Sequence, residues 1–557
     1  MKKELESIIL SAFDKAYEKG ALPSAQKTHP IVEVPRQESH GDFSTNIAMV
    51  SASIQKMAPA KIANILLDHI DDPNKIIAKT EIAGPGFINF HLTPESWFTI
   101  LKKIHQQKDR FGSCNIGQGE RVMVEFVSAN PTGPLHVGHG RGAAVGDSIA
   151  KILSFCGYDV VKEYYINDSG RQIKTLGRSV YLRYCELFGK SIDYPDDCYQ
   201  GEYIRELATQ EKNKNNQYLL DMGRDDAVSK LACTAAKEIL KGIRDDLNAF
   251  RVEFENWFSE QNLYDTQKVQ NAFKWAREND LAYDKDGAVW FRTKRWGDEK
   301  DRVICKNNGQ NTYFASDIAY HKDKFERGFT RLIDVWGADH HGYIERMSAA
   351  IESFGKNRDQ FNVVLVQLVN LLRNGEPVAM STRSGEFVTL KDVIDEVGSD
   401  ACRFLFLMRH HDSPLDFDLE VAKKQTNDNP VYYVQYVHAR ISSIIKKAKS
   451  ELPESSLIDS DTFDTLSVLN TLDDLRLIKS MAEFPGVVRT CTERLEPHRI
   501  TFYLMNLASL FHNYYNKNRV LTDDPALTSG RLYLVKAVQM IIKNGLTLLG
   551  VHAPESM

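Results

Sequence analysis

The sequence predicts an α/β protein in which a central parallel sheet lies between a smaller α+β domain and a helical bundle. Two observations support this. Strand-like segments alternate with helical ones through the middle of the chain, whereas the last third is almost entirely helical in pattern. Alternating strands and helices build parallel sheets covered on both faces. The predicted fold class is therefore α/β, with a Rossmann-type parallel-sheet domain at the centre, an N-terminal α+β domain and a C-terminal all-α helical bundle.

Size and composition set limits on the class of protein. A chain of 557 residues with 42% hydrophobic content should form several domains with real cores. The net charge of −5 indicates no global attraction to nucleic acid, so any RNA binding must come from local patches. No run of eighteen apolar residues occurs, which predicts that no segment spans a membrane.

The eight cysteines are scattered and form no CxxC pair. This spacing predicts neither a cysteine zinc site nor a disulfide framework, and it indicates a reducing cytoplasm as the location. The first twenty residues contain Glu4, Glu6 and Asp14. They indicate an amphipathic helix rather than a signal peptide.

The first predicted domain covers residues 1–115. A helical pattern over 59–70 is followed by a short strand-like piece over 80–92. Residues 108–120 contain three glycines and are typical of a linker.

The second predicted domain covers residues 116–395 and should contain the parallel sheet. Its strand candidates are 121–127, 158–166, 331–336 and 362–369. Between the second and third of these, residues 168–290 are charged and mostly helical in pattern, so we interpret them as an insertion.

The third predicted domain covers residues 396–557. In its segment 431–449, an apolar stripe is formed by Val434, Val437, Ile441 and Ile444. Tyr433, Tyr436 and Arg440 recur one residue earlier, on an adjacent face. Aromatic rings beside a cation can stack unpaired bases, although tyrosines at the rim of a bundle core would give the same pattern.

The segment 128-SANPTGPLHVGHGRG-142 lies between a strand candidate and a helical pattern. Ligands of doubly wound sheets bind at such junctions, against helix N-termini. Pro134 fixes the backbone before the helix, and Gly138 and Gly140 remove side chains where a ligand could approach. His136 and His139, three residues apart on a helix, share one face and suit phosphate binding. A helix cap with two surface histidines is the alternative.

The segment 129-ANPTGPLHVGH-139 resembles the His-Ile-Gly-His signature of class I aminoacyl-tRNA synthetases, in the form that arginyl-tRNA synthetases carry. Further segments resemble that family in the same order along essentially the whole chain. They are 40-HGDFSTNIA-48, 84-GPGFINFHL-92, 254-FENWFSE-260, 335-VWGADHHGYI-344, 380-MSTRSGEFVTL-390, 429-NPVYYVQYVHARI-441 and 549-LGVHAPESM-557.

The resemblance implies an arginine–tRNA ligase that uses ATP, with its Mg²⁺, to activate L-arginine and then charges tRNA(Arg). The amino acid's carboxylate is the nucleophile, so the protein mainly supplies positioning and charge stabilisation. The implied catalytic residues are His136 and His139, and Gly337, His340, His341 and Tyr343 are implied to line the adenine side. The other positions implied to bind ATP are Ala129, Asn130, Pro131, Thr132, Gly133, Pro134, Leu135, Val137, Gly138, Met380 and Ser381.

Arginine is implied to bind at a second group of positions. A guanidinium is best met by a carboxylate, and Asp317 lies one helical turn after Tyr313, on the same face. Glu125 is a further candidate, but a glutamate at a strand end often pairs with a neighbouring lysine. The remaining positions implied to contact arginine are Ser128, Asn130, His136 and His340.

The sequence departs from the family in its second signature, a Lys-Met-Ser-Lys-Ser loop whose lysines neutralise pyrophosphate. Here the loop reads Ala379-Met380-Ser381-Thr382-Arg383-Ser384, so both lysine positions are lost. Some arginyl enzymes place a lysine just upstream of the first signature instead, but this chain has Gly133 there. Arg383 is the only cation in 374–385, and we expect it to take the catalytic role of the lysines.

The resemblance also implies a tRNA surface. Tyr433, Tyr436 and Met557 match tRNA-contacting positions of the anticodon-binding domain, and Phe87 and Asn89 lie near the pattern that contacts the tRNA elbow. The expected protein is cytoplasmic and monomeric, with no dedicated metal site and no membrane partner. Two alternatives stay open: a nucleotidylyltransferase that uses the same HxGH motif, and a synthetase-like tRNA-binding protein with weakened catalysis.

Overall fold

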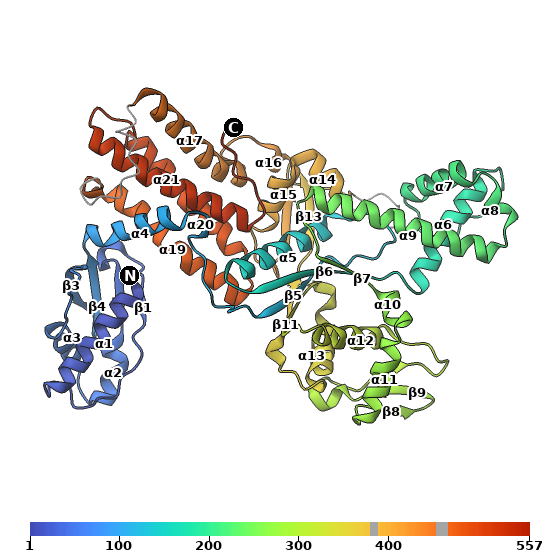
Figure 1. Cartoon of the computed structure of the whole chain (residues 1–557), viewed down its shortest axis with the longest axis horizontal. Coiled ribbons are helices and arrows are strands. Elements are labelled where there is room, and N and C mark those ends of the chain that lie inside the picture. Colours follow the sequence, from blue (N-terminus) through green and yellow to red (C-terminus); the bar gives the residue numbers. More distant parts are fainter. Residues whose placement is uncertain (379–387, 453–465) are drawn as a thin grey trace. The chain divides into compact units, whose positions relative to one another are not determined.

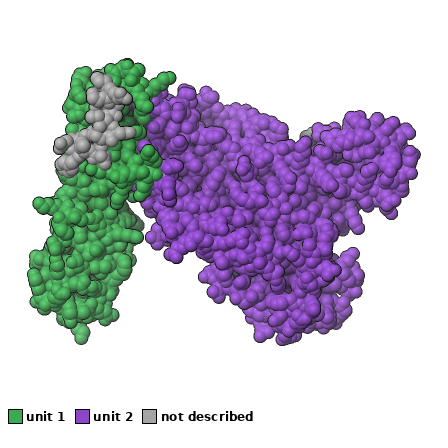
Figure 2. Space-filling model, viewed as in Figure 1, with its two compact units in different colours: residues 1–108, 445–482, 513–538 green, residues 109–444, 483–512, 539–557 purple. Residues whose placement is uncertain are grey.

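The structure is a computed structural model that describes residues 1–378, 388–452 and 466–557 (Figure 1). The chain divides into two units, which Figure 2 shows in separate colours. The first consists of residues 1–108, 445–482 and 513–538. The second consists of residues 109–444, 483–512 and 539–557. Among the helices of the described residues, none has the length and hydropathy needed to cross a lipid bilayer.

The N-terminal part of the first unit is an antiparallel sheet with helices, as expected. Its four strands are ordered β1-β2-β4-β3. The single strand-like piece expected over 80–92 is instead a hairpin, because Gly84 and Gly86 adopt positive φ and turn the chain. The elements are α1 (Lys2–Glu18), β1 (Val32–Glu33), η1 (Glu38–His40), β2 (Phe43–Thr45), α2 (Ile47–Gln55), α3 (Pro59–Asp68), β3 (Ile77–Ala83), β4 (Phe87–Leu92), α4 (Pro94–Gln107) and η2 (Lys108–Arg110).

The second unit contains the predicted parallel sheet, with strand order β12-β11-β5-β6-β7 and every pair parallel. The four expected strands are present, so this prediction is confirmed. The candidate over 362–369 breaks after Val366, and the chain continues into a strand of another sheet. The strands are β5 (Arg121–Glu125), β6 (Asp159–Ile166), β7 (Asn256–Ser259), β11 (Arg331–Gly337) and β12 (Phe361–Val366).

Helix α5 (Val137–Phe155) follows β5 and is buried along most of its length. Small residues allow this: a Cβ added at Gly146 would lie 2.3 Å from Cγ of the buried Phe126. Arg141 and Arg403 are fully buried and extend the contacts of this helix into neighbouring loops. Arg403 donates to the Asp147 carboxylate on α5 at 2.5 Å.

The segment expected as an insertion is mostly helical. Four helices lie between β6 and β7: α6 (Arg171–Glu186), α7 (Glu202–Asn215), α8 (Tyr218–Asp221) and α9 (Arg224–Ala249). They appear together at one side of Figure 1. A hydrophobic core then joins the residues between β7 and β12 to the sheet. Besides β11, the elements between β7 and β12 are α10 (Glu260–Asp265), α11 (Lys268–Glu278), β8 (Ala282–Lys285), β9 (Ala288–Phe291), η3 (Thr293–Trp296), β10 (Arg302–Cys305), α12 (Tyr313–Glu326), η4 (Ala338–Tyr343), α13 (Ile344–Ser353) and η5 (Arg358–Gln360).

A three-stranded sheet and three short helices follow the parallel sheet. Its last strand was not expected, because the sequence pattern of this region predicted helices. The elements are β13 (Val369–Arg373), β14 (Glu376–Pro377), α14 (Leu390–Val397), α15 (Ser399–Phe406), β15 (Leu415–Asp418) and α16 (Leu419–Lys423).

Long helices dominate the rest of the chain, as predicted. The expected apolar stripe of α17 is confirmed, because Val434, Val437, Ile441 and Ile444 are all buried. Four of the five boundaries between the two units fall within these helices, and the fifth lies between residues 108 and 109. The helices are α17 (Pro430–Glu451), α19 (Leu472–Arg494), α20 (His498–Lys517) and α21 (Pro525–Leu548).

Candidate active site

The candidate site lies where β5 and β11 end. These strands are parallel neighbours, and Glu125 at the end of β5 pairs in register with Asp334 of β11. Because parallel strands end at the same edge of a sheet, the loops that follow them emerge side by side. The HxGH segment follows β5, and η4 follows β11. The structure thus brings the two predicted halves of a nucleotide site to one edge.

The backbone just after β5 is strained. Val127 and Ser128 have φ values of 67° and 40°, which residues other than glycine rarely adopt. Such a conformation costs about 1–3 kcal/mol per residue and persists only where its surroundings enforce it. Here the Ser128 hydroxyl donates to Glu125 Oε1 at 2.9 Å and accepts from the Tyr165 N–H at 3.1 Å. The strain directs Ser128 back toward the sheet edge.

Three side chains hold the turn that begins the HxGH segment. The Tyr164 hydroxyl donates to the carbonyl of Ala129 at 2.8 Å, and the Tyr203 hydroxyl donates to that of Thr132 at 2.7 Å. Asn130 donates through its side-chain amide to Gln172 at 2.6 Å. We did not identify Tyr164, Tyr203 and Gln172 from sequence. Only Tyr164 lay in a predicted strand, and the other two lie in the insertion, where no motif indicates them.

The two histidines do not both lie on the helix, which corrects the expectation of one shared helical face. His136 is the residue before α5, with extended backbone (φ −98°, ψ 169°), and His139 is in the first turn. Their rings nevertheless stack, with centroids 3.7 Å apart. His136 Nδ1 accepts from the Gly138 N–H at 3.1 Å, and His139 Nδ1 accepts from the His136 N–H at 3.2 Å.

This pattern fixes the protonation of both imidazoles. Because each Nδ1 accepts a hydrogen bond, each proton must be on Nε2, which can then donate to a ligand. Burial lowers the pKa of His136, and burial followed by the neighbouring His136 lowers the pKa of His139 to about 3. Both rings are therefore neutral donors at physiological pH.

The chain returns to this motif after the second signature. His136 forms an antiparallel bridge with Thr389, and the Leu390 N–H donates to the Leu135 carbonyl at 2.7 Å. A Cβ added at Gly140 would lie 2.5 Å from Leu390, so this glycine permits the approach. The predicted ATP residues Met380 and Ser381 and the predicted catalytic Arg383 lie outside the described residues.

Asp317 and Tyr313 occupy the first turns of α12. Tyr313 is 66% exposed, whereas Asp317 is half-buried and accepts a hydrogen bond from the Tyr343 hydroxyl. Burial raises the pKa of Asp317 to about 6. Tyr343 therefore contacts the Asp317 carboxylate, which is predicted to bind the guanidinium of arginine. The resemblance implied Tyr343 only for the adenine side of the ATP site. An aspartate that is costly to ionise is a suitable receptor for a cationic ligand.

Glu125 has the lysine partner that the sequence analysis had considered as the alternative. Lys324, fully buried on α12, donates to Glu125 Oε2 at 2.5 Å and to Asp334 Oδ1 at 3.0 Å. Burial alone would lower the pKa of Lys324, but Asp334 and Glu125 raise it above the ordinary value. Lys324 and His321 in turn lower the pKa of Asp334 to about 2, against the effect of burial. The Glu125 carboxylate thus has internal partners on both oxygens.

The predicted adenine-side residues of η4 are accessible. Gly337, His340 and His341 are exposed, and His340 Nε2 lies 3.7 Å from a carboxylate oxygen of Asp339. A Cβ at Gly337 would lie 2.5 Å from the same carboxylate, so glycine keeps this strand end open. These side chains are available to a ligand at the sheet edge.

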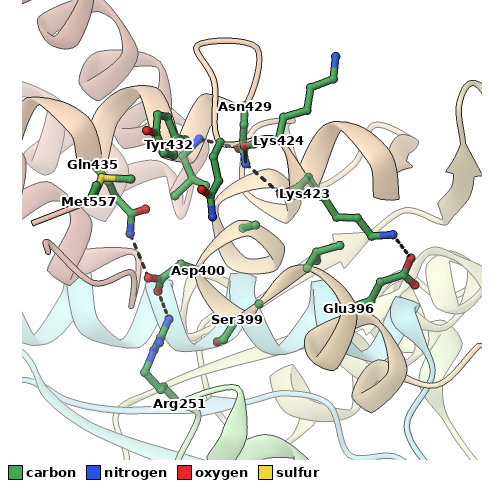
Figure 3. Close-up of a pocket in the computed structure, with 16 residues that line it drawn as sticks. Arg251, Glu396, Ser399, Asp400, Lys423, Lys424, Asn429, Tyr432, Gln435 and Met557 are labelled. Atoms are coloured by element: carbon green, nitrogen blue, oxygen red, sulfur yellow. Dashed lines mark hydrogen bonds and ion pairs between the residues drawn. The ribbon is translucent and has the colours of Figure 1, made fainter.

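A pocket of about 560 Å³ lies elsewhere in the second unit, around the last residue of the chain (Figure 3). Met557 lines it together with Tyr432 and Gln435 of α17, and Gln435 donates to Asp400 at 3.0 Å. Asp400 also pairs with Arg251. The pocket is not part of the HxGH site.

The predicted tyrosines lie close to this pocket along α17. Tyr433 and Tyr436 are half-buried, and their rings lie 4.5 Å and 5.9 Å from that of His512. Tyr436 also stacks with Tyr432, with centroids 6.2 Å apart. The spacing did not indicate Tyr432, because it lies beyond the face of Tyr433 and Tyr436, on the side away from the apolar stripe.

In the first unit, β4 carries both predicted elbow residues. Phe87 is 39% exposed at the start of the strand, and Asn89 is buried at 3% exposure in its centre. Asn89 is paired in register with Ser44 and Glu81. The structure thus presents Phe87, and not the Asn89 side chain, to solvent.

Three family models match consecutive parts of the chain. They are the arginyl tRNA synthetase N terminal domain over residues 3–92, the catalytic domain of tRNA synthetases class I (R) over 100–423, and the DALR anticodon binding domain over 434–557. The predicted boundaries at 115 and 395 stay predictions.

Curated relatives match over the full length. The chain is 58% identical to the arginine–tRNA ligase of Desulfosudis oleivorans over 559 residues and 52% identical to that of Syntrophotalea carbinolica over 560 residues. In both cases all of each chain is covered.

Solved structures agree. A putative arginyl-tRNA synthetase of Campylobacter jejuni has a TM-score of 0.76 at 34% identity, covering 84% of this chain and 100% of its own. The arginyl-tRNA synthetase of Thermus thermophilus has the same fold, with a TM-score of 0.74 at 22% identity over 100% of both chains. These matches confirm the predicted fold class. The chain therefore belongs to the arginyl-tRNA synthetase family of class I aminoacyl-tRNA synthetases.

Proposed function

We infer that this chain is an arginine–tRNA ligase that joins L-arginine to tRNA(Arg) in two steps at the edge of its parallel sheet. An oxygen of the arginine carboxylate attacks the α-phosphorus of ATP, and the bond to pyrophosphate breaks. A hydroxyl of the terminal tRNA ribose then attacks the carbonyl carbon of the adenylate and releases AMP. Two observations support this function: the pair of neutral histidines at the start of α5, and the aspartate on α12 that burial makes costly to ionise.

We propose that ATP lies over the turn after β5. The Nε2–H groups of His136 and His139 would donate to phosphate oxygens, where they stabilise charge that develops in the transition state. The turn residues 129–139, the η4 residues Gly337, His340, His341 and Tyr343, and Met380 and Ser381 complete the proposed ATP site. The donors around the turn are imidazoles and amides rather than paired carboxylates, so Mg²⁺ would be held by the phosphates of ATP.

We propose that Asp317 receives the arginine guanidinium, with the exposed Tyr313 beside it. The Tyr343 hydroxyl holds the Asp317 carboxylate in place. Asn130, Ser128, His136 and His340 would contact the rest of the amino acid. Glu125, whose oxygens are bound by Ser128 and Lys324, contributes by orienting Ser128.

We propose that the aromatic surface of α17 receives the tRNA. Tyr433, Tyr436 and the newly identified Tyr432 would stack unpaired bases, and the pocket around Met557 has the volume to enclose a nucleobase. In the first unit, Phe87 is the proposed contact to the tRNA elbow, and the buried Asn89 supports its strand.

We propose that Arg383 neutralises the pyrophosphate in place of the missing lysines. It is six positions before Thr389, which pairs with His136, and a chain of that length spans at most about 20 Å. Arg373 is the matched control, because it already pairs with Glu396 and Glu420. Arg383→Ala should slow ATP–pyrophosphate exchange strongly and Arg373→Ala weakly. A near-normal Arg383→Ala enzyme would refute this role.

We propose a cytoplasmic monomer. The eight cysteines are free, in agreement with a reducing compartment. Sedimentation equilibrium of the purified protein tests the monomeric state, and a dimer mass would contradict it.

An aminoacylation assay with arginine, ATP, Mg²⁺ and bulk tRNA tests the function. Exchange of pyrophosphate into ATP should be measured with and without tRNA, because arginyl enzymes as a family require tRNA for activation. Charging with arginine supports the proposal, and exchange driven by another amino acid would refute the specificity. Binding of tRNA without exchange would favour the non-catalytic alternative, and transfer of AMP to a non-amino-acid acceptor would favour the nucleotidylyltransferase.

A further inference from the structure

Three potential metal ligands that are far apart in sequence meet in the second unit, outside the site already described. They are His410, in the loop between α15 and β15, and Glu496 and His498, where α19 gives way to α20. One ligand atom from each lies within 4.8 Å of the others, and all three side chains are half-buried. Two imidazoles and one carboxylate converge there without a cysteine.

The neighbouring contacts orient His410. Nδ1 of His410 contacts the Asp412 carboxylate and lies 3.3 Å from the Asp412 N–H; with its proton on Nδ1, toward the carboxylate, the Nε2 lone pair is free. That nitrogen faces Glu496 Oε1 at 3.4 Å. A carboxylate behind the imidazole is the usual support of a metal-bound histidine, since it fixes the tautomer and raises the basicity of the ring.

The other two groups are also directed to the same point. Arg499 binds Oε2 of Glu496 through Nε and Nη2, both at 2.5 Å, so Oε1 is left for His410 or an ion. The His498 ring lies 4.9 Å from the His410 ring, at an interplanar angle of 68°. His498 Nδ1 is buried and has no hydrogen-bond partner among the described residues. An unpaired buried nitrogen of this kind costs free energy unless a ligand satisfies it.

We propose that His410, Glu496 and His498 form a binding site for one divalent transition-metal ion, of which Zn²⁺ is the best match. Imidazole and carboxylate donors suit Zn²⁺, whereas Mg²⁺ and Ca²⁺ require oxygen ligands. Three protein ligands leave a fourth position for water. The competing interpretation, an imidazolium held between Asp412 and Glu496, does not satisfy Nδ1 of His498.

The position of the site indicates a structural role. The loop that carries His410 is also bound by Arg141 of α5, which donates to the carbonyls of His410 at 3.0 Å and Ser413 at 2.8 Å. An ion would join this loop to the turn between α19 and α20. The helix that begins with the HxGH motif would thus be connected through one loop to the helical part of the unit.

A zinc titration tests the site. The full-length protein, stripped with a chelator, is titrated with ZnCl₂ against a chromophoric competitor, and Co²⁺ uptake is followed by its visible absorption. We expect one tight equivalent, lost in His498→Ala and in Glu496→Gln. Asp412→Asn should weaken binding about 10–100-fold, the range for a group behind a metal ligand. Zn²⁺ should raise the unfolding temperature of the wild type and not that of His498→Ala or Glu496→Gln.

His69→Ala is the matched control, because this histidine lies at the end of α3 and its Nδ1 contacts the carbonyl of Ile65 on its own helix. It should bind zinc like the wild type. The titration is repeated with Cys233→Ser, which removes an exposed thiol that could bind zinc separately. If the wild type takes up no stoichiometric zinc, or if His498→Ala and Glu496→Gln bind as tightly as the wild type, the site does not exist.

Discussion

At the scale of single residues, the candidate site is a set of groups whose protonation is fixed by their neighbours. The backbone N–H donors of His136 and Gly138 place the protons of both histidines on Nε2. Asp317 is different, because Tyr343 is the one donor to its carboxylate among the residues that the structure describes, and burial makes ionisation costly. A cation that binds at Asp317 would therefore stabilise the ionised form of this carboxylate.

This interaction with a bound cation predicts the behaviour of the Asp317→Asn variant. The variant should lower kcat/KM for arginine about 100-fold, as expected when a buried charge loses its partner, while the KM for ATP changes little. Pyrophosphate exchange with tRNA present measures both. Asp286→Asn, on the exposed turn between β8 and β9, is the control and should match the wild type. Equal loss of arginine and ATP binding would contradict a specific guanidinium contact.

The same aspartate predicts a pH dependence. Burial raises its pKa to about 6 in the folded protein, above the ordinary value of 3.8. Ionised Asp317 binds arginine, so kcat/KM for arginine should fall as the pH drops through about 6. The sign for stability is opposite: the folded state binds the proton more tightly, so this group destabilises the free protein as the pH rises through 6. The Asp317→Asn variant should thus unfold at a higher temperature than the wild type at pH 8. The unfolding temperatures of the two proteins should converge near pH 4.

At the scale of elements, α5 shows which parts of the site the sequence could predict. A β-branched run, a Gly/Pro turn and an apolar helical spacing predicted β5, the turn and α5 correctly, because each is a local pattern. The N-cap position of His136 could not be predicted, since it depends on the hydrogen bonds that the folded turn makes. The pairing of Glu125 with Lys324 joins residues of different elements, and spacing along the chain does not record it.

The glycines of α5 make a paired prediction. A Cβ at Gly146 would lie 2.3 Å from Phe126, whereas nothing lies within 4 Å of one at Gly142. Gly146→Ala should therefore destabilise the protein by about 1–3 kcal/mol, the usual cost of overpacking. Gly142→Ala should stabilise it by about 0.5–1 kcal/mol, because it only limits the unfolded chain and favours the helix. Thermal unfolding midpoints of both variants give the comparison, and shifts of the same sign would show that α5 is not packed on β5 as described.

At the scale of the whole molecule, order and class of the domains were predictable, but the contacts that join them were not. The alternation of strands and helices gave the parallel sheet, and the family motifs indicated the domains on either side. The hydrogen bonds of Arg403 connect residues distant in sequence: Asp147, the Phe250 carbonyl at 3.0 Å and the Leu549 carbonyl at 2.9 Å. The cluster of His410, Glu496 and His498 also joins residues that are distant in sequence, and the spacing of the cysteines could not reveal it.

Arg403 accordingly predicts a global effect on the second unit. Arg403→Met removes one of the three cations that pair with buried Asp147 among the described residues, the others being Lys151 and Lys162, and it removes the donor to two buried carbonyls, which together should cost about 3–5 kcal/mol. Arg489→Met, which removes an exposed pair with Glu493 one turn away, should cost less than about 0.5 kcal/mol. Chemical denaturation followed by circular dichroism measures both. A small effect of Arg403→Met would mean that water replaces the guanidinium.

The ion cluster around Lys324 also restricts how this sequence can diverge. An intermediate sequence that has lost Lys324 alone leaves the buried carboxylates of Glu125 and Asp334 without their lysine, and one that has lost either carboxylate alone removes one of the two partners of Lys324. Selection should remove such intermediates, so drift at one position requires a compensating change at another. Across arginyl-tRNA synthetases, these three positions are expected to covary. An ancestral protein that changed only one of them would have lost folding stability before it lost the ability to bind arginine.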